Sequence, residues 1–188
     1  DINEREGAVY GAKLEFVLID AVGRDWQCGT IQVDLNLPPR LNANYVDKDG
    51  SKQNPVMIHR AFFGSLERFI GILIENYSGR LPNWLSPVQV CIVNINDDCL
   101  KYCYKLLDLL KEKGIRCDVD ARNEKMNYKI REHTMSKTPY IVVIGNKEVN
   151  NDTVSLRTFG DQKQEILTIE NFIKKIKISC SMPETVSN

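Results

Sequence analysis

The chain has 188 residues, with 43% hydrophobic and 27% charged side chains, which is typical of a globular protein. Its 25 basic and 25 acidic residues exclude an overall cationic field, although a local basic patch is still enough for contacts with phosphate groups. No apolar run reaches the ~18–20 residues that a membrane span needs, and the charged residues 1–6 contain no signal-peptide segment, so we predict no membrane association.

The first half of the chain predicts antiparallel strands followed by an amphipathic helix. Residues 13–20 and 26–35 have strand patterns around a turn at 22–25, and residues 47–50 indicate a second turn. From Ser65, the expected N-cap, the apolar residues take helical spacing as far as Tyr77. The sequence has no initial Met and enters the strand pattern almost directly, which predicts a segment of a longer protein.

Strands and helices alternate after a boundary near residues 79–87, where two prolines interrupt the pattern. The predicted strands are 88–95, 116–120, 140–144 and 154–158, and the predicted helices are 98–113, 127–137 and 169–178. This alternation is typical of βαβ units. We therefore predict two domains: an α+β domain with an antiparallel sheet at 1–81, and an α/β domain with a mixed, mostly parallel sheet at 82–188.

The strand at 26–35 has one consistently polar face. Alternation places Cys28, Thr30, Gln32 and Asp34 on that face, and Gly29 permits close approach of a backbone or a substrate. A face of this kind meets either a ligand or water, and the pattern alone leaves both interpretations open.

Two further residues allow a functional or a structural interpretation. His59 follows an apolar run and is either a hydrogen-bonded core histidine or a metal ligand. Arg68 lies in the first turn of the predicted helix, where a cation opposes the helix dipole. It therefore serves either a surface salt bridge or an anion such as a triphosphate.

The six cysteines contain no Cys-x-x-Cys pair, which excludes a zinc ribbon. Several lie within apolar strands or on helix faces, where a free cysteine behaves as a small hydrophobic residue. We predict structural roles for them, a reducing compartment and a cytoplasmic location.

Three blocks of the first half resemble consecutive blocks of the class II threonyl-tRNA synthetases. They are residues 6–13 (EGAVYGAK), 26–32 (WQCGTIQ) and 59–73, the last of which is similar to the third class II signature. Residues 122–125 (RNEK), 129–134 (KIREHT) and 139–140 (PY) fit the anticodon-binding domain of the same family. Ala12 departs from the pattern, because the family usually has Pro there. The resemblance implies part of a class II catalytic domain followed by an anticodon-binding domain.

The resemblance also implies a reaction. The family activates L-threonine with ATP and magnesium and transfers the threonyl group to the 3′ end of threonine tRNA. Its zinc ion, held by one Cys and two His, binds the threonine hydroxyl and so rejects valine. His59 is the implied zinc ligand here, and the other two ligands are expected upstream. The implied threonine and ATP contacts are Tyr10, Lys13, Gln27, Cys28, Thr30, Gln32, Ser65 and Arg68, with Arg68 as the catalytic residue.

In the second domain, Asn123, Glu148 and Arg157 match positions that read anticodon bases in the family. Lys125, Lys129 and Arg131 form a basic stripe that either meets phosphate groups or is a solvated helix face. The family is usually dimeric, which implies a homodimer for the whole protein.

Three functional hypotheses stay open from the sequence. The first is a threonine–tRNA ligase of which this segment alone is inactive, because the first two class II signatures are expected upstream. The second is a stand-alone module that binds tRNA anticodons. The third is a synthetase paralogue without catalysis.

Overall fold

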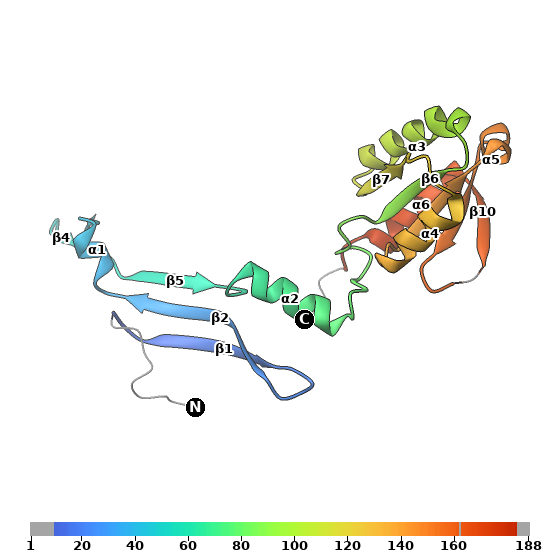
Figure 1. Cartoon of the computed structure of the whole chain (residues 1–188). Helices are drawn as coiled ribbons and strands as arrows, with labels where there is room; N and C mark the ends of the chain where they lie inside the picture. The colour runs from blue at the N-terminus through green and yellow to red at the C-terminus, as the bar shows by residue number, and fades with distance from the viewer. Residues whose placement is uncertain (1–9, 162, 184–188) are drawn as a thin grey trace. The chain divides into compact units, whose positions relative to one another are not determined.

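The computed structural model describes residues 10–161 and 163–183. The chain divides into two compact units, residues 1–76 and 77–188, which are described separately (Figure 1). The sequence placed the boundary after Leu81. The residues just before that position pack on the second unit: the Arg80 guanidinium lies 5.1 Å from the centroid of the Phe159 ring. Residues 6–9 of the first block that resembles the synthetases lie outside the described residues.

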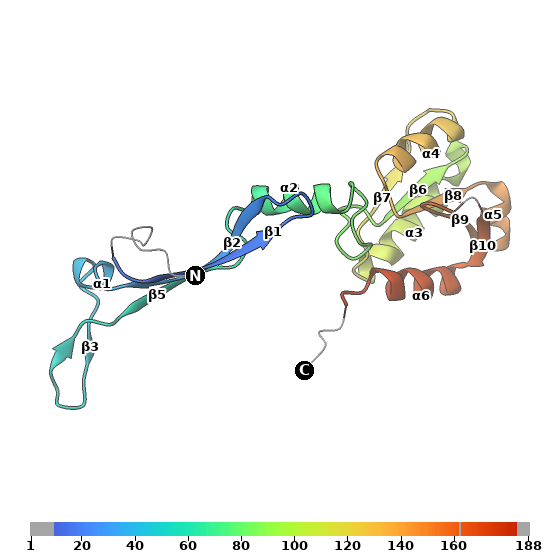
Figure 2. The same cartoon turned by 90° about the horizontal axis from the view of Figure 1, so that it is seen from below.

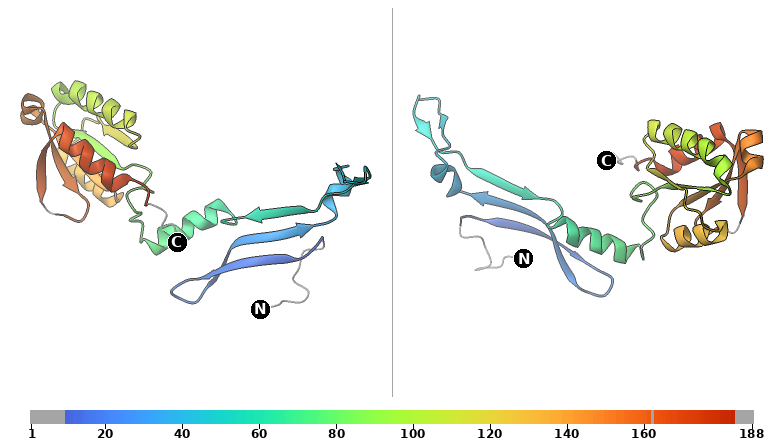
Figure 3. Two further views of the ribbon diagram at one scale, coloured as in Figure 1. Left: turned by 180° about the vertical axis from the view of Figure 1, so that it is seen from behind. Right: turned by 45° about the horizontal axis from the view of Figure 1, so that its top comes forward.

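The first unit contains a three-stranded antiparallel sheet in the order β1-β2-β5 (Figure 3). Its strands are β1 (Lys13–Ile19), β2 (Asp25–Asp34) and β5 (Met57–Ala61). The β1–β2 turn is held by Asp20, whose carboxylate accepts hydrogen bonds from the backbone amides of Val22 and Arg24 at 3.0 and 2.9 Å. Short α1 (Leu37–Arg40) and the hairpin β3 (Tyr45–Val46) to β4 (Lys52–Gln53) connect β2 to β5.

Helix α2 (Leu66–Asn76) follows β5 and confirms the predicted amphipathic helix. The Ser65 hydroxyl accepts a hydrogen bond from the Arg68 backbone amide at 3.2 Å, as an N-cap does. None of the residues of α2 is buried. Its apolar stripe is therefore at most half-buried among the described residues.

The second unit contains a mixed five-stranded sheet in the order β10-β9-β8-β6-β7. Strands β6 (Val90–Asn94), β7 (Cys117–Asp120) and β8 (Tyr140–Ile144) are parallel, whereas β9 (Thr153–Thr158) and β10 (Gln164–Thr168) are joined by antiparallel pairing. All residues of β6 and β8 are buried. Central strands covered on both faces have this continuous apolar character, which explains why both were predictable from sequence.

Helices cover both faces of this sheet (Figure 2). Helix α3 (Leu100–Glu112), which follows the 3₁₀ turn η1 (Asp97–Cys99), and α6 (Ile169–Cys180) pack on one face. Helix α4 (Met126–Met135) packs on the other face through Ile130. Short α5 (Asn146–Asn151) follows β8. No helix in the described part of the chain has the length and apolarity of a membrane span.

Candidate substrate and nucleic-acid sites

The polar face of the first sheet lines a cavity of about 730 Å³. Antiparallel pairing sets Gln32 of β2 opposite His59 of β5, and Thr30 opposite Ala61. Residues directly opposite in a sheet project to the same side, so these side chains share one face. Tyr10, Thr30, Gln32 and His59 all line the cavity, and thus four of the predicted site residues are brought together.

Asp34 supports His59 from within this face. Its carboxylate is buried, accepts hydrogen bonds from the backbone amides of Asn36 and Leu37 at 2.9 and 2.8 Å, and lies 3.0 Å from Nε2 of His59. The hydrogen bond from the Leu37 amide, followed by that from His59, lowers the pKa of Asp34. Because the ionised carboxylate is an acceptor, Nε2 of His59 is the nitrogen that donates to it, and Nδ1 is the ring nitrogen left for another partner.

The predicted zinc site is not complete among the residues that the structure describes. Among residues 10–161 and 163–183, no three His, Cys, Asp or Glu side chains converge to hold a metal ion. Among the described residues, His59 and Asp34 are the two cavity-lining side chains of metal-binding type, and the Asp34 carboxylate fits the arrangement in which a second group orients a metal-binding histidine. The zinc site therefore stays a prediction, with His59 as the ligand that this cavity offers.

Three other predicted contacts lie on the same sheet outside the cavity lining. Lys13 forms an ion pair with Glu15, and the Gln27 amide donates a hydrogen bond to the same carboxylate at 2.7 Å. Cys28 is buried and does not line the cavity. Lys13 and Gln27 thus meet at Glu15, and the contacts of all three residues with a substrate stay predictions.

Ser65 and Arg68 stand at the start of α2. The Ser65 hydroxyl donates to the Glu67 carboxylate at 2.8 Å and caps the helix at the same time. The Arg68 side chain is exposed and has no hydrogen-bond or ion-pair partner among the described residues. The structure thus favours neither the salt bridge nor any other internal role for Arg68, and its guanidinium is accessible to an anion.

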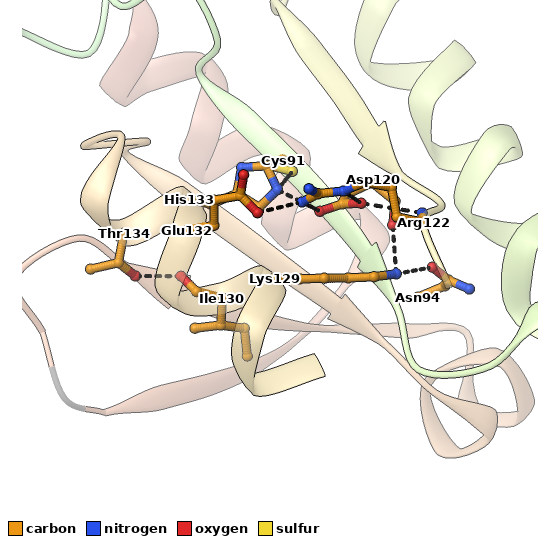
Figure 4. Close-up of polar contacts among 9 residues, drawn as sticks. All are labelled: Cys91, Asn94, Asp120, Arg122, Lys129, Ile130, Glu132, His133 and Thr134. Atoms are coloured by element: carbon orange, nitrogen blue, oxygen red, sulfur yellow. Dashed lines mark hydrogen bonds and ion pairs between the residues drawn. The ribbon is translucent and has the colours of Figure 1, made fainter. Parts of the chain in front are cut away.

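In the second unit, Asn123 is exposed on the loop between β7 and α4. The loop is fixed by Arg122, whose guanidinium donates to Asp120 at 2.9 and 2.7 Å and to Glu132 at 2.7 Å (Figure 4). Hydrogen bonds from Arg122, and to a smaller extent from His133, hold the pKa of Asp120 well below its usual range. The backbone around Asn123 is therefore held while its side chain is accessible.

Cys91 and His133 lie next to this clamp, but they do not form a nucleophilic pair. Nε2 of His133 is 2.8 Å from the Asp120 carboxylate and 3.3 Å from Sγ of Cys91. The carboxylate is an acceptor, so Nε2 carries the proton and cannot take one from the thiol. Burial, followed by the nearby Asp120 charge, raises the pKa of Cys91 to about 12. Cys91 is thus a structural thiol, as the sequence predicted.

Lys129 is the largest departure from the predicted basic stripe. Its side chain is only 1% exposed, so it is neither a phosphate contact nor part of a solvated face. Its ammonium donates to Oδ1 of Asn94 and to the backbone carbonyl of Asp120, both at 2.9 Å (Figure 4). Lys125 and Arg131 are exposed as predicted. The sequence signal for the burial of Lys129 was its place between Met126, Ile130 and His133, at helical spacing on the inner face of α4.

The other two predicted base readers have partners within the unit. Oε2 of Glu148 accepts a hydrogen bond from the Gly145 amide at 2.9 Å and so caps α5. Arg157 of β9 donates to Gln164 at 3.3 Å, while its buried Nε has no partner in the described residues. Asn123 and Glu148 follow the carboxyl ends of parallel strands β7 and β8, whereas Arg157 pairs with Ile141 near the start of β8. Asn123 and Glu148 therefore lie at one edge of the sheet and Arg157 further along β9.

Family models match both units. Residues 1–77 match the tRNA synthetase class II core domain (G, H, P, S and T), and residues 89–178 match the anticodon binding domain. The chain belongs to the class II aminoacyl-tRNA synthetases.

Relatives within this family are named threonine–tRNA ligases. That of Caulobacter sp. (strain K31) is 52% identical over 97% of this chain, and that of Pelagibacter ubique (strain HTCC1062) is 53% identical over 92%. The chain spans 28% and 27% of their lengths. A crystal structure described as the RNA binding domain of threonyl-tRNA synthetase from Cryptosporidium parvum Iowa II is 36% identical, with a TM-score of 0.78 over 97% of this chain and 46% of that one. These matches confirm the predicted family and fold for both halves.

Proposed function

We propose that this synthetase segment belongs to a threonine–tRNA ligase, which activates L-threonine with ATP and transfers it to the 3′ end of threonine tRNA. The observation that carries the proposal is the presence, in one chain, of the polar cavity with His59 and of the clamped loop that exposes Asn123. Identity of about half the residues to threonine–tRNA ligases over nearly the whole chain supports the choice of amino acid.

The first unit would supply one wall of the aminoacylation site. The cavity size suits an amino acid, and Tyr10, Thr30 and Gln32 offer hydroxyl and amide groups for its polar atoms. His59, oriented by Asp34, would be one zinc ligand, and the zinc would contact the threonine hydroxyl. The accessible guanidinium of Arg68 would bind the triphosphate of ATP with its magnesium. A complete zinc site and catalysis would require residues beyond those described.

The second unit would bind the anticodon of threonine tRNA. Unpaired anticodon bases are read at their edges, and an exposed amide such as that of Asn123 can donate and accept at a base edge. Lys125 and Arg131 of α4 are exposed and would contact phosphate groups. For the whole protein we propose a cytoplasmic homodimer, on the basis of the family resemblance and of six free thiols.

The test is a titration of the 188-residue chain with two transcripts: threonine tRNA, and the same tRNA with one anticodon base replaced. We expect the matched tRNA to bind more tightly, and both affinities to fall as salt rises. Asn123→Ala should reduce the discrimination by about 1–3 kcal/mol, the cost of one lost polar contact at a buried base edge. Lys101→Ala is the control, because Lys101 is exposed on α3, on the opposite face of the sheet from α4.

Each result decides a separate question. Equal affinity of the unmodified chain for both transcripts would contradict anticodon reading. Discrimination that survives Asn123→Ala would keep the function but assign the reading to other residues. Anticodon discrimination by the chain, together with threonylation by a longer form that contains it, would favour the ligase over a stand-alone module or a paralogue without catalysis.

A further inference from the structure

Lys129 stands at the junction of two strands, and its position is unusual for a lysine. A fully buried ammonium group is costly unless its surroundings compensate for the lost hydration. Here the two partners at 2.9 Å are both neutral oxygens, one from the Asn94 side chain and one from the Asp120 backbone. The buried lysine does not neutralise an adjacent carboxylate, so pairing of charges does not explain its presence.

The two acceptors are the last residues of neighbouring parallel strands. Asn94 ends β6 and Asp120 ends β7, so the ammonium joins the two strands at their carboxyl edge (Figure 4). Ligands of open α/β sheets bind outside this edge, where the loops leave the strands. Lys129 thus fixes the points from which two loops begin.

One of these loops carries Asn123. Beyond Asp120, the chain is held by the Arg122 side chain and by the hydrogen bond from the Glu124 amide to the Arg122 carbonyl at 2.9 Å. Asn123 lies between these two residues, with its side chain exposed. Its position therefore depends on the Asp120 backbone, whose carbonyl Lys129 binds.

The other loop leads toward Glu148. The side-chain amide of Asn94 donates to the backbone carbonyl of Asn96 at 3.0 Å. The side-chain amide of Asn96 in turn donates to Oδ1 of Asn146 at 3.1 Å. Asn146 begins α5, the helix that Glu148 caps. A chain of hydrogen bonds thus connects the ammonium of Lys129 with the segments that carry both candidate readers at this edge.

We infer that Lys129 is a positioning residue for base recognition: its buried ammonium sets the loop of Asn123 relative to the start of α5, although it touches no RNA itself. The inference rests on the proposed reading of an anticodon and adds a residue that fixes the geometry of that reading. It also explains why a cation is retained where an apolar side chain would bury at lower cost.

The test substitutes Lys129→Met, which keeps an unbranched side chain one heavy atom shorter and removes the charge and the hydrogen bonds. The 188-residue chain is titrated with the two transcripts described above. We expect the affinity ratio, matched tRNA over altered tRNA, to be at least tenfold smaller in Lys129→Met than in the unmodified chain. A loss of folded protein would reduce both affinities equally, so the ratio reports positioning rather than stability. Lys101→Met is the matched control and should leave the ratio unchanged.

Backbone hydrogen exchange gives a second measurement that needs no tRNA. In Lys129→Met, the amides of Arg122 and Glu124 should exchange several-fold faster, while those of central β8 should stay protected. Unchanged exchange at these amides, or an unchanged affinity ratio, would overturn the inference. If the unmodified chain does not discriminate between the transcripts, the proposed function and the inference fail together, whereas discrimination that survives Lys129→Met removes the inference alone.

A milder variant covers the case in which Lys129→Met does not fold. Asn94→Asp keeps an acceptor for the ammonium and forms an ion pair with it, but removes the amide that donates to the Asn96 carbonyl. We expect the protein to remain folded with a reduced affinity ratio and faster exchange at the Gly145 amide, which donates to Glu148 at the start of α5. A normal ratio in a folded Asn94→Asp protein would contradict the proposed connection to α5.

Discussion

The two units hold their polar side chains by different physical means. Among the described residues of the first unit, four are buried, and α2 contributes none of them. The second unit has a core of fifteen buried residues between its sheet and helices α3 and α6. Its candidate loop is fixed to that core by hydrogen bonds to buried polar groups. The second site is therefore pre-organised by its own unit, and the first is not.

The apolar surface of the first unit explains the difference. Strand β1 exposes most of its residues, with Phe16 and Ile19 at 51% and 73% exposure, and α2 exposes Ile70 at 52%. An amphipathic strand or helix gains stability only when its apolar side packs against another layer. The local order of this unit thus comes mainly from sheet hydrogen bonds and from the Asp20 turn.

The largest expected effect comes from comparing an apolar substitution in the core of the second unit with one on α2 of the first. Phe172→Ala removes a fully buried ring of α6 and should lower the free energy of unfolding by about 3–5 kcal/mol. Ile70→Ala, on half-exposed α2, should cost less than about 1 kcal/mol, because much of its side chain is already hydrated. Urea unfolding followed by circular dichroism measures both. Equal losses would show that α2 has a packing partner that the structure lacks.

The second prediction concerns pH and the Arg122 clamp. Because the folded-state pKa of Asp120 is lowered, its stabilisation is present above the unfolded value of about 4 and is lost as pH falls. Asp120→Asn should therefore cost about 1.5–3 kcal/mol at pH 7, and the difference from the unmodified chain should shrink steadily as pH falls below the unfolded value of about 4. Urea unfolding at several pH values gives this difference.

The first unit offers the comparison for that experiment. Asp20 also has a lowered pKa, chiefly through the hydrogen bond from the Trp26 indole, but it stands in an exposed turn. Asp20→Asn should change the main unfolding transition less than Asp120→Asn does. A larger effect of Asp20→Asn would mean that the turn of the first unit contributes to the cooperative core.

The buried strands and amphipathic helices were predictable from sequence because their patterns come directly from burial. Residues 140–144 were predicted as a strand with the observed bounds, and the long helices of the second unit differ from prediction by at most two residues at either end. The pattern missed helices α1 and α5 and strands β3, β4, β5 and β10. Helix α5 has six residues and depends on a local cap by Glu148, and β10 is a largely exposed edge strand with no continuous apolar run. Such elements are set by their surroundings rather than by periodicity.

The candidate sites likewise contain features that were predictable from sequence and features that were not. The polar face of β2 was predictable, because alternation fixes which side chains share a face, and Thr30, Gln32 and Asp34 do line one cavity. The support of His59 by Asp34 was not, because it joins two strands 25 positions apart in sequence. Lys129 was misread because its charge outweighed its position among inward-facing residues of α4. Long-range polar contacts of this kind are visible only in the folded chain.

The smallest expected effect comes from substitutions that remove one side-chain N-cap from each unit. Ser65 caps α2 by accepting from the Arg68 amide, and Thr168 caps α6 by accepting from the Asn171 amide at 3.4 Å. Loss of either cap costs about 1 kcal/mol, or roughly a fivefold change in the local equilibrium.

In exposed α2, Ser65→Ala should raise the rate of backbone hydrogen exchange by that factor along the whole helix, because no buried side chain holds the later turns. In α6, Thr168→Ala should affect the first turn only, since Phe172 and Ile176 anchor the rest in the core. Faster exchange along all of α6, or unchanged exchange in α2, would show that burial within the chain does not set the difference between the units.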